Sequence, residues 1–258
     1  MALTESQINY LKDVLRSSIR NKFASHNPEP SAKPFHIRLL GKDRLELHSF
    51  MHGLLTNFGI TIFEPIAEAL AKQKFKTSLK QIKSGTELTE SSLFVIQEII
   101  DGLETAERTP DKINEIMAIR QVCKEGKARN VKPIKVDLYL ESYEDEIFLI
   151  DLKTVKPNMG NFRDFKRTLL VWVAVTLFNK PDAKINTLLA IPYNPYEPKL
   201  YNRWTMKGMI DLVHELKVAK EFWDFLGGDG AYEILLSCFE QVGIEMREEI
   251  DKYFKRFE

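Results

Sequence analysis

The sequence predicts an α/β domain with a central mixed β-sheet, flanked by helices and extended by helices at both ends of the chain. Two apolar runs, 136–140 and 147–154, lie on either side of a polar turn and are expected to pair as strands. An apolar helical pattern over 162–179 stops before Pro181 and is followed by a third apolar run at 185–192. The order strand, strand, helix, strand inside a helical frame favours a mixed sheet.

The segments around this core have mostly helical patterns. Apolar residues Ile8, Leu11, Leu15 and Ile19 recur at helical spacing, and a loop rich in proline covers 25–36. Thr89 is a suitable N-cap for the helix that begins there. The expected helices outside the core cover 5–24, 44–58, 61–75, 88–103, 111–125, 206–226 and 231–257, the last interrupted near Gly243.

Length and composition favour one soluble domain. We expect a single domain over 1–258, with a catalytic core at about 45–195 and a helical C-terminal part at about 205–258. No apolar run is long enough to cross a membrane, and the first residues do not resemble a signal peptide. With only two cysteines in the chain, a reducing cytoplasm is the expected location.

The two paired runs each carry a carboxylate where an apolar residue is expected. A hairpin centred on Glu144 would place Asp137 opposite Asp151, with Cβ atoms about 4.5–5.5 Å apart. Lys153 would share their face, because strand side chains alternate. Opposed carboxylates repel each other unless a cation lies between them, and Mg²⁺ favours one or two carboxylates plus phosphate oxygens. A register slip of one residue would separate the two aspartates.

The charge distribution limits how this chain could bind a polyanion such as a nucleic acid. The 37 basic and 37 acidic residues give no net charge, so any nucleic-acid-binding surface must be local. Basic residues gather in three runs, 72–83, 120–135 and 151–167, and the last two flank the aspartates in sequence. A run of this kind is more often a solvated face than a binding site.

The three polar residues of the hairpin match a known pattern. Asp137 followed by Asp151-Leu152-Lys153 resembles the PD-(D/E)xK signature of type II restriction endonucleases, with Val136 in place of the proline. The chain resembles the TdeIII-like group of these enzymes in particular, and the likeness covers about residues 45–230. The segments that carry it are Lys153-Thr154, Lys156-Pro157-Asn158, Gly160-Asn161-Phe162, Phe165-Lys166-Arg167, Asn57–Glu64 and Lys220–Trp223.

This resemblance implies Mg²⁺-dependent cleavage of double-stranded DNA at a short palindromic site. Asp137, Asp151 and the backbone carbonyl of Leu152 would bind Mg²⁺, and Lys153 would orient the attacking water and offset negative charge. The expected products carry 5′-phosphates and 3′-hydroxyls, and the expected target is GGNCC-like. A palindromic target implies a homodimer, and a cognate methyltransferase would act on the same site without having to bind this chain.

The resemblance also suggests residues around this centre. Related nucleases take an extra carboxylate from an upstream helix, which makes Glu64 a catalytic candidate and Glu98 a weaker one. An ordinary surface glutamate explains Glu64 equally well. Candidate DNA-binding residues are Asn158, Asn161, Arg163, Lys166 and Arg167. We expect Lys166 and Arg167 to bind phosphates.

Other patterns point elsewhere or remain open. Phe162, Phe165, Leu169 and Trp172 recur at helical spacing and are expected in the core or in a dimer interface. His48 and His52 have a spacing that suits zinc, but no third ligand is evident. A repair or structure-specific nuclease with the same core is an alternative function. A non-catalytic DNA-binding protein with a degenerate nuclease fold is another.

Overall fold

A five-stranded mixed sheet forms the centre of the molecule, in a computed structural model that describes residues 3–25, 33–153, 161–201, 206 and 208–255. The strand order is β1-β4-β5-β6-β7. The β1–β4 and β4–β5 pairs are antiparallel, and the β5–β6 and β6–β7 pairs are parallel. The strands are β1 (Thr77–Lys83), β4 (Lys135–Glu141), β5 (Glu146–Leu152), β6 (Lys184–Ile191) and β7 (Leu216–Val218). The predicted fold class is confirmed.

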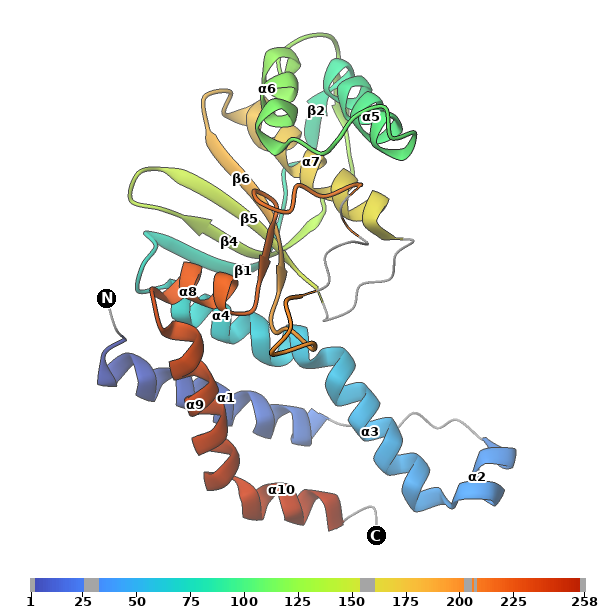
Figure 1. Ribbon diagram of the computed structural model, residues 1–258, viewed down its shortest axis with the longest axis vertical. Coiled ribbons are helices and arrows are strands. Elements are labelled where there is room, and N and C mark those ends of the chain that lie inside the picture. Colours follow the sequence, from blue (N-terminus) through green and yellow to red (C-terminus); the bar gives the residue numbers. More distant parts are fainter. Residues whose placement is uncertain (1–2, 26–32, 154–160, 202–205, 207, 256–258) are drawn as a thin grey trace.

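Helices cover both faces of this sheet (Figure 1). The buried core therefore consists of two clusters, each of which joins the sheet to a different set of helices. One cluster joins the sheet to α5 (Glu90–Glu104), α6 (Lys112–Val122) and α7 (Phe162–Asn179), beside a small sheet of β2 (Glu87–Thr89) and β3 (Ala128–Asn130). The other joins it to α1 (Glu5–Ser25), α4 (Glu64–Ala71), α8 (Lys220–Gly227) and α9 (Ala231–Glu245). Phe162, Leu169 and Trp172 of α7 are buried in the first cluster, so they are core residues.

A helical arm projects from this body (Figure 1). It consists of α2 (Pro34–Leu40), which has no buried residue, and α3 (Lys42–Phe58). Helix α3 continues through a π-helical turn, η1 (Gly59–Phe63), into α4. Phe50 of α3 is buried against Phe23 of α1 and against Tyr253 and Phe254 at the end of α10 (Arg247–Phe254), which attaches the arm to the body.

Several predicted elements differ from the structure. The segment 206–226 is not one helix: it contains turns, the short strand β7 and α8. The helix expected to reach Phe75 ends at Ala71, because the chain turns there into β1. The C-terminal helix breaks at Met246 rather than near Gly243. Strands β1, β2 and β3 were not predicted.

Other local predictions are confirmed. Helix α7 covers 162–179 as expected. Thr89 caps α5 by accepting a hydrogen bond from the backbone N–H of Ser92 at 3.1 Å. Within the part of the chain that the structure describes, no helix is both long and apolar enough to span a membrane.

Candidate active site

The β4–β5 hairpin has the register that the sequence predicts. Leu138 pairs with Ile150, and Tyr139 pairs with Leu149. The same register, extended by one residue, places Asp137 opposite Asp151, and the charge of Asp137 acts on Asp151. Two acidic side chains therefore meet on one face of the sheet, at the end of the hairpin that lies away from its turn.

The two aspartates have different environments. Asp137 accepts a hydrogen bond from the backbone N–H of Leu152 at 2.9 Å, and the ammonium of Lys135 lies 3.6 Å from its Oδ1. Asp151 is 7 % exposed, and burial raises its pKa to about 7. Lys153 lowers that pKa and the negative charge of Asp137 raises it. Protons and cations therefore compete for Asp151 near neutral pH.

Lys153 is held beside Asp151 by backbone and side-chain contacts. Its backbone N–H donates to the carbonyl of Ala190 on β6 at 2.9 Å. Its ammonium lies 2.7 Å from Oδ1 of Asp151 and 4.7 Å from the ring centroid of Phe165. Phe165 thus packs beneath the charge and limits its positions.

Glu64 lies beside these residues at the start of α4. It is 2 % exposed, so the interpretation as an ordinary surface glutamate is wrong. Burial raises the pKa of Glu64, the charge of Asp137 raises it further, and Gln81 opposes the shift by donating to Oε2 of Glu64. The weaker candidate, Glu98, is exposed on α5.

Gln81 was missed by sequence reasoning. It lies on β1 between Lys80 and Ile82, which pair with Leu138 and Val136, so it stands opposite Asp137. Its backbone has φ +58°, a left-handed conformation that is uncommon for a residue with a side chain. Such strain concentrates at functional sites. No spacing or composition in the sequence marks Gln81.

The donor set suits Mg²⁺ better than a metal that needs a closed site. Asp137 and Asp151 could supply two carboxylates, and the backbone carbonyl of Leu152, the residue between Asp151 and Lys153, could supply a third oxygen. In the described ranges there is no group of three or more His, Cys, Asp and Glu side chains arranged to hold a metal. Mg²⁺ keeps several waters and takes oxygens from substrate phosphates, so it does not require such a group.

The predicted DNA-binding residues have different outcomes. Asn158 lies outside the described residues. Asn161 and Arg163 are exposed at the start of α7, and Arg163 is 3.2 Å from Glu104. Arg167 donates to the side chain of Gln97 at 2.6 Å.

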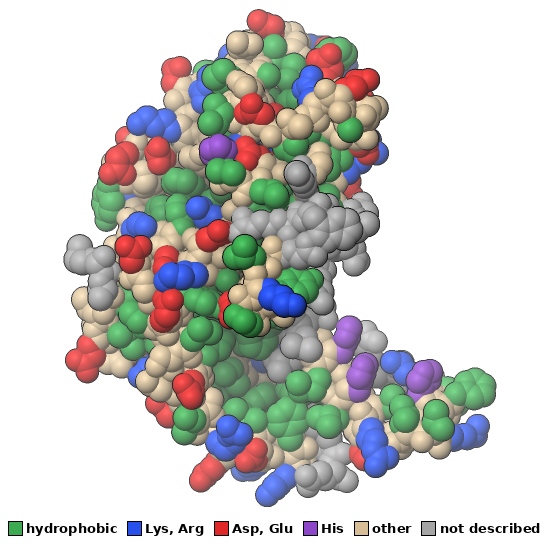
Figure 2. Space-filling model, in the orientation of Figure 1, with side chains coloured by type: hydrophobic (Ala, Val, Ile, Leu, Met, Phe, Trp, Pro, Cys, Tyr) green, Lys and Arg blue, Asp and Glu red, His purple; other side chains and the backbone are tan. Residues whose placement is uncertain are grey.

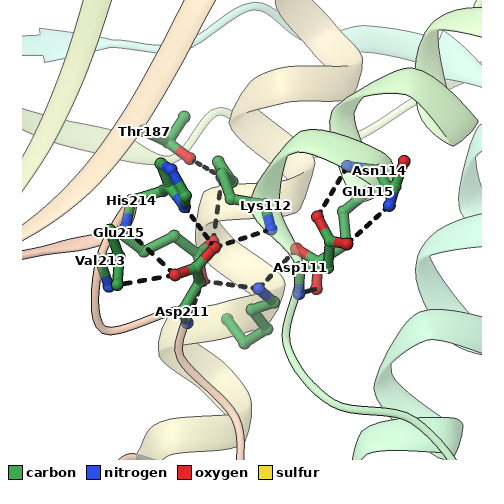
Figure 3. Close-up of polar contacts among 10 residues, drawn as sticks. Asp111, Lys112, Asn114, Glu115, Thr187, Asp211, Val213, His214 and Glu215 are labelled. Carbon is green, nitrogen blue, oxygen red and sulfur yellow. Dashed lines mark hydrogen bonds and ion pairs between the residues drawn. The ribbon is translucent and has the colours of Figure 1, made fainter.

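The phosphate contact predicted for Lys166 is wrong. Its side chain is fully buried, with Nζ 2.5 Å from Glu115 and 2.6 Å from Glu215. Lys112 lies 3.0 Å from the other oxygen of Glu215 and donates to Thr187. We call Lys112, Glu115, Lys166 and Glu215 the buried network. Figure 3 labels three of its members, Lys112, Glu115 and Glu215.

Comparison with known proteins agrees with this geometry. Residues 3–243 match the model of the family described as type II restriction endonuclease, HinfI. The chain belongs to this family. The identification as a type II restriction endonuclease is therefore confirmed, while the HinfI family match does not specify the TdeIII-like group.

Curated relatives of this HinfI family member are also restriction enzymes. The chain is 31 % identical to the type II restriction enzyme MjaII of Methanocaldococcus jannaschii over 72 % of its own length, and it spans 51 % of that enzyme. It is 24 % identical to HgiCII of Herpetosiphon aurantiacus, over 89 % of this chain and 84 % of the relative. The type II restriction enzyme HgiEI of the same organism is 22 % identical, over 97 % of this chain and 98 % of the relative.

Proposed function

We propose that this chain is a Mg²⁺-dependent endonuclease that cleaves double-stranded DNA at a short palindromic site and leaves 5′-phosphates and 3′-hydroxyls. The observation that carries the proposal is the hairpin register, which joins Asp137 and Asp151 to Lys153 on one face. Membership of the HinfI family supports DNA as the substrate.

Each residue of this site has a role in the proposed reaction. When bound by Asp137, Asp151 and the carbonyl of Leu152, Mg²⁺ would polarise the scissile phosphate and lower the pKa of a water. Lys153 would hold the attacking water and offset the negative charge that develops on the phosphate. The water oxygen would bond to phosphorus and lose a proton to solvent, the bond from phosphorus to the 3′ oxygen would break, and that oxygen would take a proton from solvent. Glu64 would add a carboxylate beside Asp137, in an orientation set by Gln81.

The family and the resemblance together suggest the partners. A palindromic target calls for two active sites related by a two-fold axis, so the chain would act as a homodimer. We expect a GGNCC-like target, as the TdeIII-like resemblance implies. A cognate methyltransferase would modify the same site without binding this chain, and both would work in the cytoplasm, where the DNA is.

Digestion of a fully sequenced phage DNA with Mg²⁺ tests this function. Wild type should give discrete fragments whose ends map the site, and Asp151→Asn should give none. Asp145→Asn is the matched control, because Asp145 is an exposed aspartate in the turn of the same hairpin. Cleavage only of branched or damaged DNA would favour a repair nuclease, and duplex binding without cleavage would favour a non-catalytic protein.

A further inference from the structure

Many cations of the predicted basic runs are engaged within the protein. Lys72 and Lys80 both lie within 4 Å of Glu68, at 3.8 and 3.4 Å. Lys76 lies 3.1 Å from Glu141, and Lys166 is buried. A duplex that reaches the active site must therefore find positive charge elsewhere as well.

The arm offers such charge. Every residue from Lys33 to Leu40 is exposed. The exposed cations are Lys33 just before α2, Arg38 in α2, and Lys42 and Arg44 at the start of α3, beside one exposed acid, Asp43. All described histidines except His214 also lie on the arm, namely His36, His48 and His52. The rings of His48 and His52 stack with their planes 8° apart.

Helix geometry directs one face of α3 away from the body. Phe50 marks the packed side, and His48 and His52 each lie two residues from it, about 200° around the helix. Arg44 precedes His48 by one turn, so Arg44, His48 and His52 form one stripe, the open face of α3. Figure 2 shows a hollow in the molecule with the arm as its lower wall, and histidine side chains gather on the edge of the arm that faces this hollow.

The arm is joined directly to the active site. Helix α3 leads through η1 into α4, whose first residue is Glu64. π-helical turns such as η1 are frequent at functional sites. From these observations we infer that the open face of α3 binds the phosphate backbone of the same DNA duplex that the active site cleaves; this inference rests on the proposed function.

DNA binding without divalent metal separates this inference from catalysis. The triple variant Arg44→Ala/His48→Ala/His52→Ala should bind a mixed-sequence duplex about tenfold more weakly than wild type. The plot of log affinity against log salt should flatten by about 1 for each DNA phosphate that the variant no longer neutralises. Lys42→Ala is the matched control, because Lys42 is a cation on another face of α3 that lies 3.5 Å from Glu46; it should bind as wild type does.

A second variant avoids disturbing α2. Arg44 donates to the carbonyl of Leu40, so His48→Ala/His52→Ala keeps that bond and should still weaken binding about threefold. Wild-type affinity and salt slope in both variants would overturn the inference, even if wild type cleaves DNA. A shift from dimer to monomer in sedimentation, with unchanged DNA affinity, would instead assign this face to a second copy. If wild type binds no duplex, the proposed function fails and the inference fails with it.

Discussion

Two clusters of lysine and carboxylate side chains lie on this sheet, and they differ in charge balance. The buried network pairs two lysines with two glutamates, all at most 5 % exposed. The catalytic cluster, which we define as Glu64, Asp137, Asp151 and Lys153, has three carboxylates and one lysine.

The difference appears in how each cluster satisfies its charges. In the buried network burial raises the pKa of Glu115 and lowers that of Lys112, but at Glu215 the charges of Lys112 and Lys166 outweigh burial and lower the pKa of that carboxyl. In the catalytic cluster burial dominates, and the pKa values of Glu64 and Asp151 are both raised. Because its charges balance, the buried network needs no ligand, whereas the catalytic cluster, with its excess of carboxylates, would gain stability from an added cation.

Breaking the buried network should give the largest effect on stability. Lys166→Met leaves Glu115 and Glu215 with only Lys112, and we expect unfolding free energy to fall by about 3–5 kcal/mol. The double variant Lys166→Met/Glu115→Gln keeps the Lys112–Glu215 pair and should recover part of this loss. Urea denaturation measures both variants. An unchanged stability for Lys166→Met would mean that the network is not structural.

Neutralising a carboxylate of the catalytic cluster should raise the free energy of unfolding when no metal is present. The pKa of Asp151 is raised to about 7 in the folded state, whereas an unfolded chain has an aspartate pKa near 4. Between about pH 4 and pH 7 the folded state therefore holds a proton that the unfolded state has released. Wild-type stability contributed by this group is therefore lost as pH rises toward about 7. With a chelator, Asp151→Asn should exceed wild type by up to about 4 kcal/mol at about pH 8 and by much less at about pH 5. An equal difference at both pH values would contradict the assignment.

Lys153→Met should separate chemistry from folding. Lys153 is more exposed than the lysines of the buried network, so its loss should lower the midpoint of thermal unfolding much less than Lys166→Met does. We expect the cleavage rate under saturating Mg²⁺ to fall about 10²–10³-fold, as for removal of a group that stabilises developing charge. Lys74→Met, at an exposed lysine of the 72–83 run, is the control. Cleavage at the wild-type rate would exclude Lys153 from the reaction.

Gln81 should give the smallest effect. Gln81→Leu removes the donor to Glu64, and the Mg²⁺ concentration for half-maximal cleavage should rise about tenfold, within the range for residues that orient metal ligands. Gln81→Gly also removes the amide but relieves the left-handed backbone. Equal shifts in both variants would assign the effect to the amide. A shift in Gln81→Leu alone would assign it to packing or backbone strain.

Strands β4 and β5 could be predicted from the sequence because the residues that define them are close together in the chain. A polar turn between two apolar runs sets the hairpin register, and the register sets which side chains meet. The helix over 162–179 was predictable for the same reason, since its apolar face and the proline that follows it are close together in the sequence.

Long-range contacts explain most of the errors. Lys166 follows Phe162 by four residues and precedes Leu169 by three, so it lies on the apolar face of α7. That position was a sign of burial, but its partners Glu115 and Glu215 are distant in sequence. Strand β1 shows only a basic run in its own sequence, because its partner β4 is more than 50 residues away. The acid that pairs with Lys80 of β1, Glu68, lies on α4.

Metal binding tests the central claim most directly, because that claim is that the catalytic cluster, and not the buried network, binds a cation. Mn²⁺, which shares the oxygen ligands of Mg²⁺, can be titrated into the metal-free protein and the free ion followed by electron paramagnetic resonance. We predict binding to wild type and to Asp145→Asn, and loss of binding in Asp137→Asn and Asp151→Asn. Undiminished binding in both of these variants, with their folds intact, would contradict the account.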